Sequence, residues 1–140
     1  MEPIKLTYTI LPGDLSRAGE ASSQMKMTLR QLGISPDIIR RASVCMYEGE
    51  SNMDIHANGG KAVVLIGMDD ITIRLADEGP GIPDVEKAMT PGWSTASDAA
   101  RGLGFGAGMG LPNMKRCSDD MTVDTTLGVG TTVTMKLILN

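Results

Sequence analysis

The sequence predicts an α+β fold: a two-layer sandwich in which a mixed, mostly antiparallel sheet of about five strands carries three helices on one face. Three observations support this. Short alternating segments rich in β-branched residues recur along the chain, pairs of them are joined by links too short for a crossover, and segments of helical apolar spacing lie between them. With 140 residues, 41% of them hydrophobic, we expect residues 1–140 to form a single domain with a buried core.

The first strand is predicted at residues 3–10, where polar and apolar residues alternate. Residues 12–14 end it, and Asp14 is the expected N-cap of a first helix that closes at Gly33. The apolar residues at helical spacing in this helix are Leu15, Ala18, Met25, Leu29 and Leu32.

A second helix starts at Ser35-Pro36, an N-cap followed by proline at the first helical position. It should run to about residue 57, where Asn58-Gly59-Gly60 ends it. Its buried stripe is predicted to consist of Ile38, Ala42, Cys45 and Gly49.

The rest of the chain alternates between hairpins and one long loop. Residues 78–107 are rich in Gly, Pro, Ser and Ala, with one weak helical piece at 83–89, and long loops of this kind are usually functional or mobile. The remaining predicted elements are strands at 61–68 and 71–77, a third helix at about 110–118, and strands at 121–126 and 131–139.

Composition narrows the function. The net charge is −4 and no cluster of Lys and Arg exceeds a pair, so nucleic acid is not an expected partner. The longest apolar run, near residues 62–67, is too short to span a bilayer, and the first residues show no basic leader or apolar segment, so we expect a cytoplasmic protein. Two cysteines favour neither a disulfide framework nor a zinc site, and eleven methionines predict a core filled by thioethers.

The stretch GLGFGAGMG, from Gly102 to Gly110, stands directly before the third helix. Glycines with free N–H groups at a helix start can cradle a phosphate, but a flexible linker explains the composition equally well. A Walker A loop is excluded because no Lys or Arg lies within residues 102–112. A dinucleotide fingerprint is excluded because the glycines are two apart and the segment before them, PGWSTASDAAR, does not read as a strand.

Three further segments carry polar groups suited to a nucleotide. Asp77 ends a strand before a Gly-Pro-Gly turn and could accept a hydrogen bond from an exocyclic amine such as that of adenine. Glu48 and Asn52 are four residues apart on one helix face, where a general base could lie beside a Mg²⁺ ligand. Thr131 opens the last strand. A surface turn, a solvated helix face and plain β-propensity are the ordinary alternatives for these three segments.

Taken together, these segments resemble the four sequence motifs of the GHKL ATPases, which include gyrase B, Hsp90, histidine kinases and MutL. The motifs read Glu48-x-x-x-Asn52, DEGPG from Asp77, GAGMGL from Gly106, and GTT from Gly130. Within that superfamily the chain is most similar to small anti-sigma-factor serine/threonine kinases of the stressosome switch-kinase type.

The resemblance implies a role for each motif. Glu48 would be the general base, Asn52 would ligate Mg²⁺, Asp77 would hold the adenine amine, and Thr131 would support that contact through water. Residues at about 84–107 would form an ATP lid. The ATP-binding residues that it implies are Asn52, Asp77, Gly79, Gly81, Ile82, Gly104, Gly106, Gly108, Met109, Gly110, Leu111 and Thr131.

The resemblance also implies the activity. ATP and Mg²⁺ would be the cofactors, and a STAS-domain antagonist protein would be phosphorylated on Ser or Thr within a partner-switching module. A sigma factor or a phosphatase is a further expected partner, and related kinases often form homodimers. The helix motif departs from the kinases at Gly49 and Glu50, so an ATP-gated regulatory protein that grips a partner without phosphorylating it is the alternative. A free ATPase would need a transducer domain.

Overall fold

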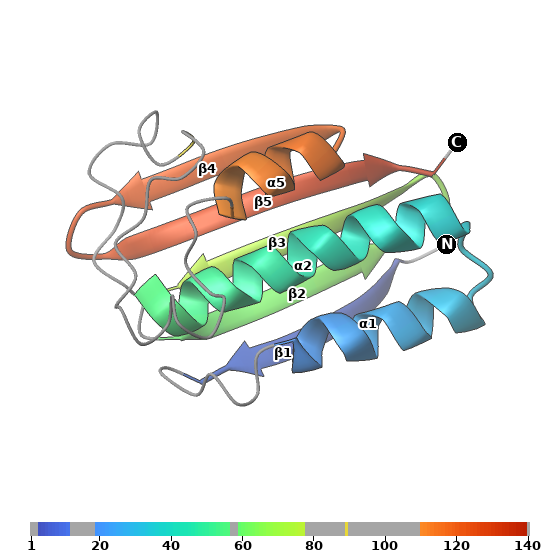
Figure 1. Ribbon diagram of the computed structural model, residues 1–140, viewed down its shortest axis with the longest axis horizontal. Coiled ribbons are helices and arrows are strands. Elements are labelled where there is room, and N and C mark those ends of the chain that lie inside the picture. The colour runs from blue at the N-terminus through green and yellow to red at the C-terminus, as the bar shows by residue number, and fades with distance from the viewer. Residues whose placement is uncertain (1–2, 12–18, 57–58, 78–88, 90–109, 140) are drawn as a thin grey trace.

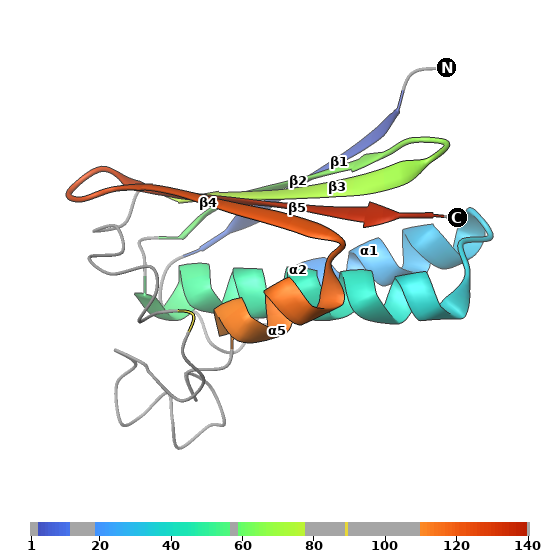
Figure 2. The same cartoon turned by 90° about the horizontal axis from the view of Figure 1, so that it is seen from above.

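The computed structural model describes residues 3–11, 19–56, 59–77, 89 and 110–139, without the side chains of 54–56. Two layers make up this part of the chain: a sheet, and helices that all cover the same face of it (Figure 1). In the view from above, none of the described helices lies on the other face of the sheet (Figure 2). The predicted α+β sandwich is confirmed.

Five strands form the sheet in the order β1-β2-β3-β5-β4, and every neighbouring pair is antiparallel. The sheet is therefore wholly antiparallel over the described residues rather than mixed. The register sets Gly60 opposite Asp77 and Ala76 opposite Thr132. The start of β2, the end of β3 and the start of β5 therefore lie side by side at one end of the sheet. The strands are β1 (Ile4–Ile10), β2 (Gly60–Ile66), β3 (Asp70–Asp77), β4 (Asp120–Thr126) and β5 (Gly130–Ile138).

The helices that the structure describes are α1 (Glu20–Gln31), α2 (Pro36–His56) and α5 (Gly110–Cys117). Their order among the strands is the predicted one. The predicted start of the first helix was too early, because α1 has Gly19 at its N-cap with φ of 91°. The expected cap Asp14 lies outside the described residues, as do Leu15, Ala18 and the helical piece at 83–88.

The boundary between α1 and α2 follows the predicted signals. Gly33 has φ of 75° and its N–H donates to the Arg30 carbonyl, a glycine-based end that satisfies a carbonyl of the last turn. Ser35 Oγ accepts from the Ile38 N–H at 3.4 Å and caps α2. Leu32 does not belong to the buried stripe: it follows the last turn of α1 and is 43% exposed.

The core lies between the sheet and the helices. The predicted stripe of α2 is buried, and four methionines (Met25, Met46, Met114 and Met135) have side chains that are almost fully inaccessible. The expectation of a thioether-filled core is confirmed, and flexible Met side chains suit the irregular gap between three helices and a twisted sheet.

Gly49 explains how α2 lies on the sheet. A Cβ at this position would overlap Cδ1 of Leu75 on β3 and lie 3.1 Å from its Cγ. Glycine inside a helix costs roughly 1 kcal/mol relative to alanine. Here it allows α2 to approach the strand that ends at Asp77, so its departure from the kinase motif is a packing requirement.

No helix in the described part of the chain combines the length and apolar character that crossing a bilayer requires.

Candidate functional site

The acidic strand end and the start of the last strand are joined by a hydrogen bond. The Thr131 N–H donates to Asp77 Oδ1 at 3.1 Å. Thr131 is 6% exposed, and its hydroxyl lies 2.9 Å from the hydroxyl of Thr125 on β4. These hydrogen bonds fix the Asp77 carboxylate at the end of β3. Asp77 and Thr131 are therefore neighbours, as expected if both belong to one nucleotide site.

At Gly60, the end of α2 packs closely against the end of β3, where Asp77 lies. A Cβ on Gly60 would overlap the Ala76 carbonyl, lie 2.8 Å from the Met53 sulfur and lie 3.0 Å from Asp77 Cα. Met53 belongs to α2 and is 3% exposed. The end of α2 and the end of β3 therefore lie on the same side of the molecule, which the predicted nucleotide site demands.

Asn52 contacts the start of α5. A Cβ on Gly110 would lie 2.8 Å from Asn52 Nδ2 and 3.0 Å from its Oδ1, so only glycine fits there without displacing the amide. The first turn of a helix presents unpaired N–H groups and the positive end of the helix dipole. A side-chain amide oxygen therefore lies beside a helix N-terminus suited to an anion.

Glu48 lies one turn earlier on α2 and is half-buried. Asn113 of α5 donates from Nδ2 to Glu48 Oε1 at 3.4 Å, and Asn113 in turn accepts from the Arg116 guanidinium. Glu48 and Asn52 both contact α5, so the prediction that they share a helix face is confirmed.

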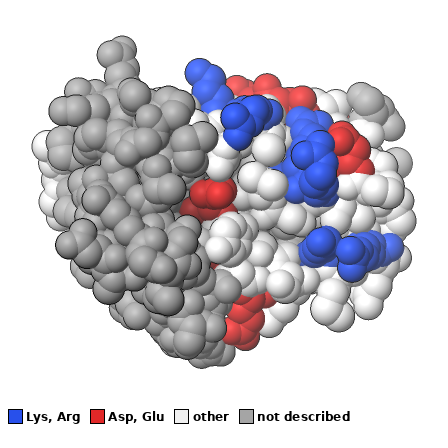
Figure 3. Space-filling model, in the orientation of Figure 1, with Lys and Arg blue, Asp and Glu red and all other residues white. Residues whose placement is uncertain are grey.

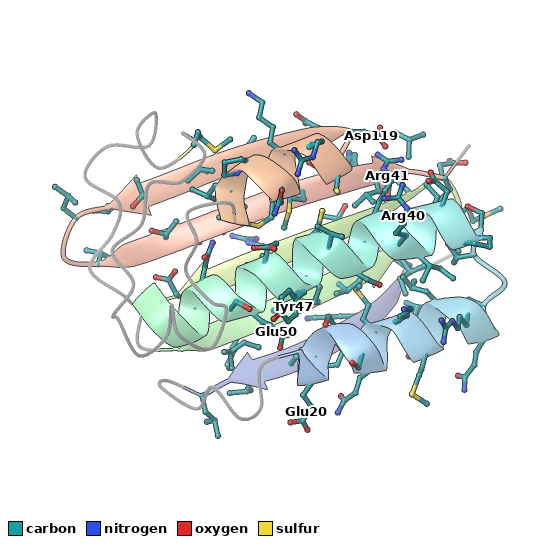
Figure 4. All side chains as sticks on the ribbon, viewed as in Figure 1. Glu20, Arg40, Arg41, Tyr47, Glu50 and Asp119 are labelled. Atoms are coloured by element: carbon teal, nitrogen blue, oxygen red, sulfur yellow. The ribbon has the colours of Figure 1, made fainter. Side chains whose placement is uncertain are left out.

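Glu50 points away from that face. It is 4% exposed, and its two carboxylate oxygens accept the N–H groups of Ala21 and Ser22, each at 3.2 Å, at the start of α1 (Figure 4). Burial raises the pKa of Glu50, and the hydrogen bonds from Ser22 and Ala21 oppose that rise. Its departure from the kinase motif thus supplies a buried cap for α1 rather than a charge at the candidate site.

The structure places the described members of the predicted site together. Asp77 and Thr131 are bonded, Asn52 contacts Gly110, and Glu48 lies one turn from Asn52. Figure 1 shows their elements meeting at the left end of the molecule. The other predicted ATP-binding residues lie outside the described residues: Gly79, Gly81, Ile82, Gly104, Gly106, Gly108 and Met109.

Leu111 has a second role. It is 7% exposed and belongs to the hydrophobic core, where it anchors the first turn of α5. A contact between Leu111 and a nucleotide stays a prediction.

Sequence reasoning missed three residues of this region. In the sequence, Gly60 belongs only to the expected end of a helix, Thr125 falls only within the strand predicted at 121–126, and Asn113 has no assigned role. The position of Asn113 within the first turn of the third helix, beside the glycine loop, was an available signal. The roles of Gly60 and Thr125 depend on strand register, which the sequence did not specify.

The described residues fit a magnesium–nucleotide complex. The Asn52 side chain and the N-terminus of α5 carry groups suited to Mg²⁺ and to phosphate, since Mg²⁺ prefers oxygen ligands and retains several waters, and the N–H groups of a first helical turn attract anions. No group of three or more His, Cys, Asp or Glu side chains forms a separate metal site within the described part of the chain.

Comparison with known proteins agrees with this geometry. Residues 33–140 match the family model described as histidine kinase-, DNA gyrase B-, and HSP90-like ATPase. The anti-sigma F factor of Caldanaerobacter subterraneus subsp. tengcongensis is 36% identical over 110 residues, which cover 75% of this chain and 73% of that protein. The serine/threonine-protein kinase RsbT of Bacillus subtilis is 31% identical over 108 residues, which cover 74% and 75%.

A solved structure shares the fold. The RsbU and RsbW domains of Rv1364c from Mycobacterium tuberculosis match with a TM-score of 0.61 over 96% of this chain, at 14% identity. This chain covers 32% of that longer one. From the match over residues 33–140 and the convergence of its motif residues, the chain belongs to the histidine kinase-, DNA gyrase B- and HSP90-like ATPase family.

Proposed function

We propose that this chain is a Mg²⁺-dependent, ATP-using serine/threonine protein kinase that phosphorylates a STAS-domain antagonist protein in a partner-switching module. The observation that supports it most is the shared contact of Glu48 and Asn52 with α5. A candidate base and a candidate metal ligand lie one helical turn apart beside a helix N-terminus. The similarity to a named serine/threonine-protein kinase points the same way.

Each residue has a defined task in this proposal. Asp77, fixed by the Thr131 N–H, would accept the adenine amino group, and the N-terminus of α5 would bind phosphate oxygens. Mg²⁺ on Asn52 would neutralise charge on the phosphates. Glu48 would accept the proton of the substrate hydroxyl while the hydroxyl oxygen bonds to the γ-phosphorus and the bond to ADP breaks. A neutral hydroxyl benefits from such a base, whereas a phosphoaccepting imidazole would not need one.

A second candidate is an ATP-gated regulatory protein that holds a partner, such as a sigma factor, without phosphorylating it. Two observations favour it. Several relatives are named anti-sigma F factor. In addition, the Glu48 carboxylate is already engaged by Asn113.

Glu48→Gln separates the two candidates. With labelled ATP, Mg²⁺ and a STAS-domain antagonist protein from the same organism, we expect wild type to label a Ser or Thr. The variant should lose about 10²- to 10⁴-fold in rate while binding ATP normally, because only the proton acceptor is removed. Glu20→Gln, which changes an acid in the first turn of α1, is the matched control. A tight complex without label in wild type would favour the regulatory protein.

A further inference from the structure

A groove of about 650 Å³ lies between α1 and α2. Along α2 it extends from Pro36 to Glu48, and Tyr47 lines it beside Glu48. The twelve residue steps from Pro36 to Glu48 correspond to about 18 Å of helix. An extended segment of about five or six residues would span that length.

The charges along the groove have one sign over most of its length. Lys26 and Arg30, one turn apart on α1, line it together with Arg40 of α2. Among the described residues, the side chains of Lys26 and Arg30 make no ion pair or hydrogen bond. Arg40 pairs with Asp37 at 2.9 Å, but both side chains are about two-thirds exposed, so this pair is weak and exchangeable.

The space-filling view agrees with this distribution. Figure 3 shows Lys and Arg side chains over the end of α1 and the start of α2, and a further group at the top of the same face, over α5. These helix ends lie away from the nucleotide site, which is at the left end of Figure 1.

Glu48 connects the groove to the candidate site. It is the single acidic side chain among the described residues that line the groove, and it also contacts Asn113 of α5. A segment lying in the groove would therefore meet three cations and then reach the proposed general base. Apolar side chains between them, Ile34 and Val44, offer contact area for an apolar residue of the same segment.

We propose that this groove docks an acidic segment of the protein substrate, with the acceptor hydroxyl at Glu48 and acidic side chains against Lys26, Arg30 and Arg40. The inference rests on the proposed function and adds a basis for substrate specificity, namely recognition of acidic residues near the acceptor. Nucleic acid is the poorer occupant, because the Glu48 carboxylate would repel phosphates and the chain carries net charge −4. The acids should lie within about five residues of the acceptor, given the span of the groove.

The test is the double variant Lys26→Glu/Arg30→Glu, assayed with the same STAS-domain protein. We expect the KM for the protein substrate to rise about tenfold or more, while kcat and the affinity for ATP stay unchanged, because the cations act on docking alone. The milder Lys26→Gln/Arg30→Gln should show a smaller rise in the same direction. Circular dichroism checks that α1 stays folded in both.

Lys5→Glu/Arg74→Glu is the matched control, since it makes the same charge change at two exposed positions on β1 and β3. An unchanged KM in the α1 variants, or an equal rise in the control, would overturn the proposal. So would loss of self-association in the α1 variants with an unchanged KM, since the groove would then belong to a second copy.

The docking groove can be tested even if the kinase proposal fails. If wild type transfers no phosphate, calorimetry of complex formation with the STAS-domain protein replaces KM. Weakened binding by the α1 variants and not by the control would support the docking groove on a non-phosphorylating protein. Equal binding by all variants would overturn it.

Discussion

Gly60 is the residue on which the placement of Asp77 depends most directly. It lies opposite Asp77 in the sheet, and a side chain there would overlap the Ala76 carbonyl and press on the Met53 sulfur. Backbone atoms cannot yield as a flexible side chain can. A methyl group should therefore separate β2 from β3 or push α2 away from the strand end.

Gly60→Ala is expected to lower the free energy of unfolding by about 1–3 kcal/mol, the usual cost of overpacking, and to weaken ATP binding. Gly67→Ala is the matched control, because its nearest contact would be an ordinary 3.5 Å to the Asp70 carbonyl. Urea unfolding followed by circular dichroism, together with ATP titration, measures both effects. Equal stability of the two variants would show that Gly60 does not set the packing at this edge.

At the scale of elements, the Glu50 side chain links α2 to the start of α1. Its carboxylate accepts two N–H groups at the start of α1, where Gly19 provides no side-chain cap. Arg41, also on α2, makes a similar link to the C-terminal end of α5. Its Nε donates to the Cys117 carbonyl at 2.9 Å, and its guanidinium pairs with Asp119 at 3.1 Å. Buried or partly buried contacts from α2 thus position both neighbouring helices.

The raised pKa of Glu50 predicts a pH-dependent stability. Because folding disfavours the charged form, the contribution of Glu50 is greatest below its ordinary pKa of 4.5 and declines as pH rises through the higher folded-state pKa. Wild type should therefore lose stability relative to Glu50→Gln between pH 4.5 and neutrality, since Gln keeps an acceptor without the buried charge.

Unfolding curves at several pH values measure that difference. Glu50→Ala should be less stable than either by about 1–3 kcal/mol, because two helix N–H groups lose their acceptor. A pH-independent difference between wild type and Glu50→Gln would contradict the account.

At the scale of the whole molecule, the sequence predicted the order of elements, because alternation, caps and turn residues act locally. The convergence of the motifs was implied by the resemblance to the GHKL ATPases. The sequence did not predict the start of α1, where the N-cap Gly19 has a left-handed backbone and the apolar spacing continued upstream of the helix. Nor could it predict that Glu50 caps α1 or that Gly60 packs against Asp77. Both contacts join segments far apart in the sequence, and their relative placement depends on packing.

The central claim is that α2, the end of β3, α5 and the start of β5 together bind one magnesium–ATP complex. Isothermal titration of ATP with and without Mg²⁺ tests it, using wild type, Asp77→Asn and Asn52→Ala. We expect wild type to bind one ATP per chain, Asp77→Asn to bind about 10- to 100-fold more weakly, and Asn52→Ala to lose most of the gain from Mg²⁺. Absence of ATP binding by wild type, or unchanged binding by both variants, would contradict the claim.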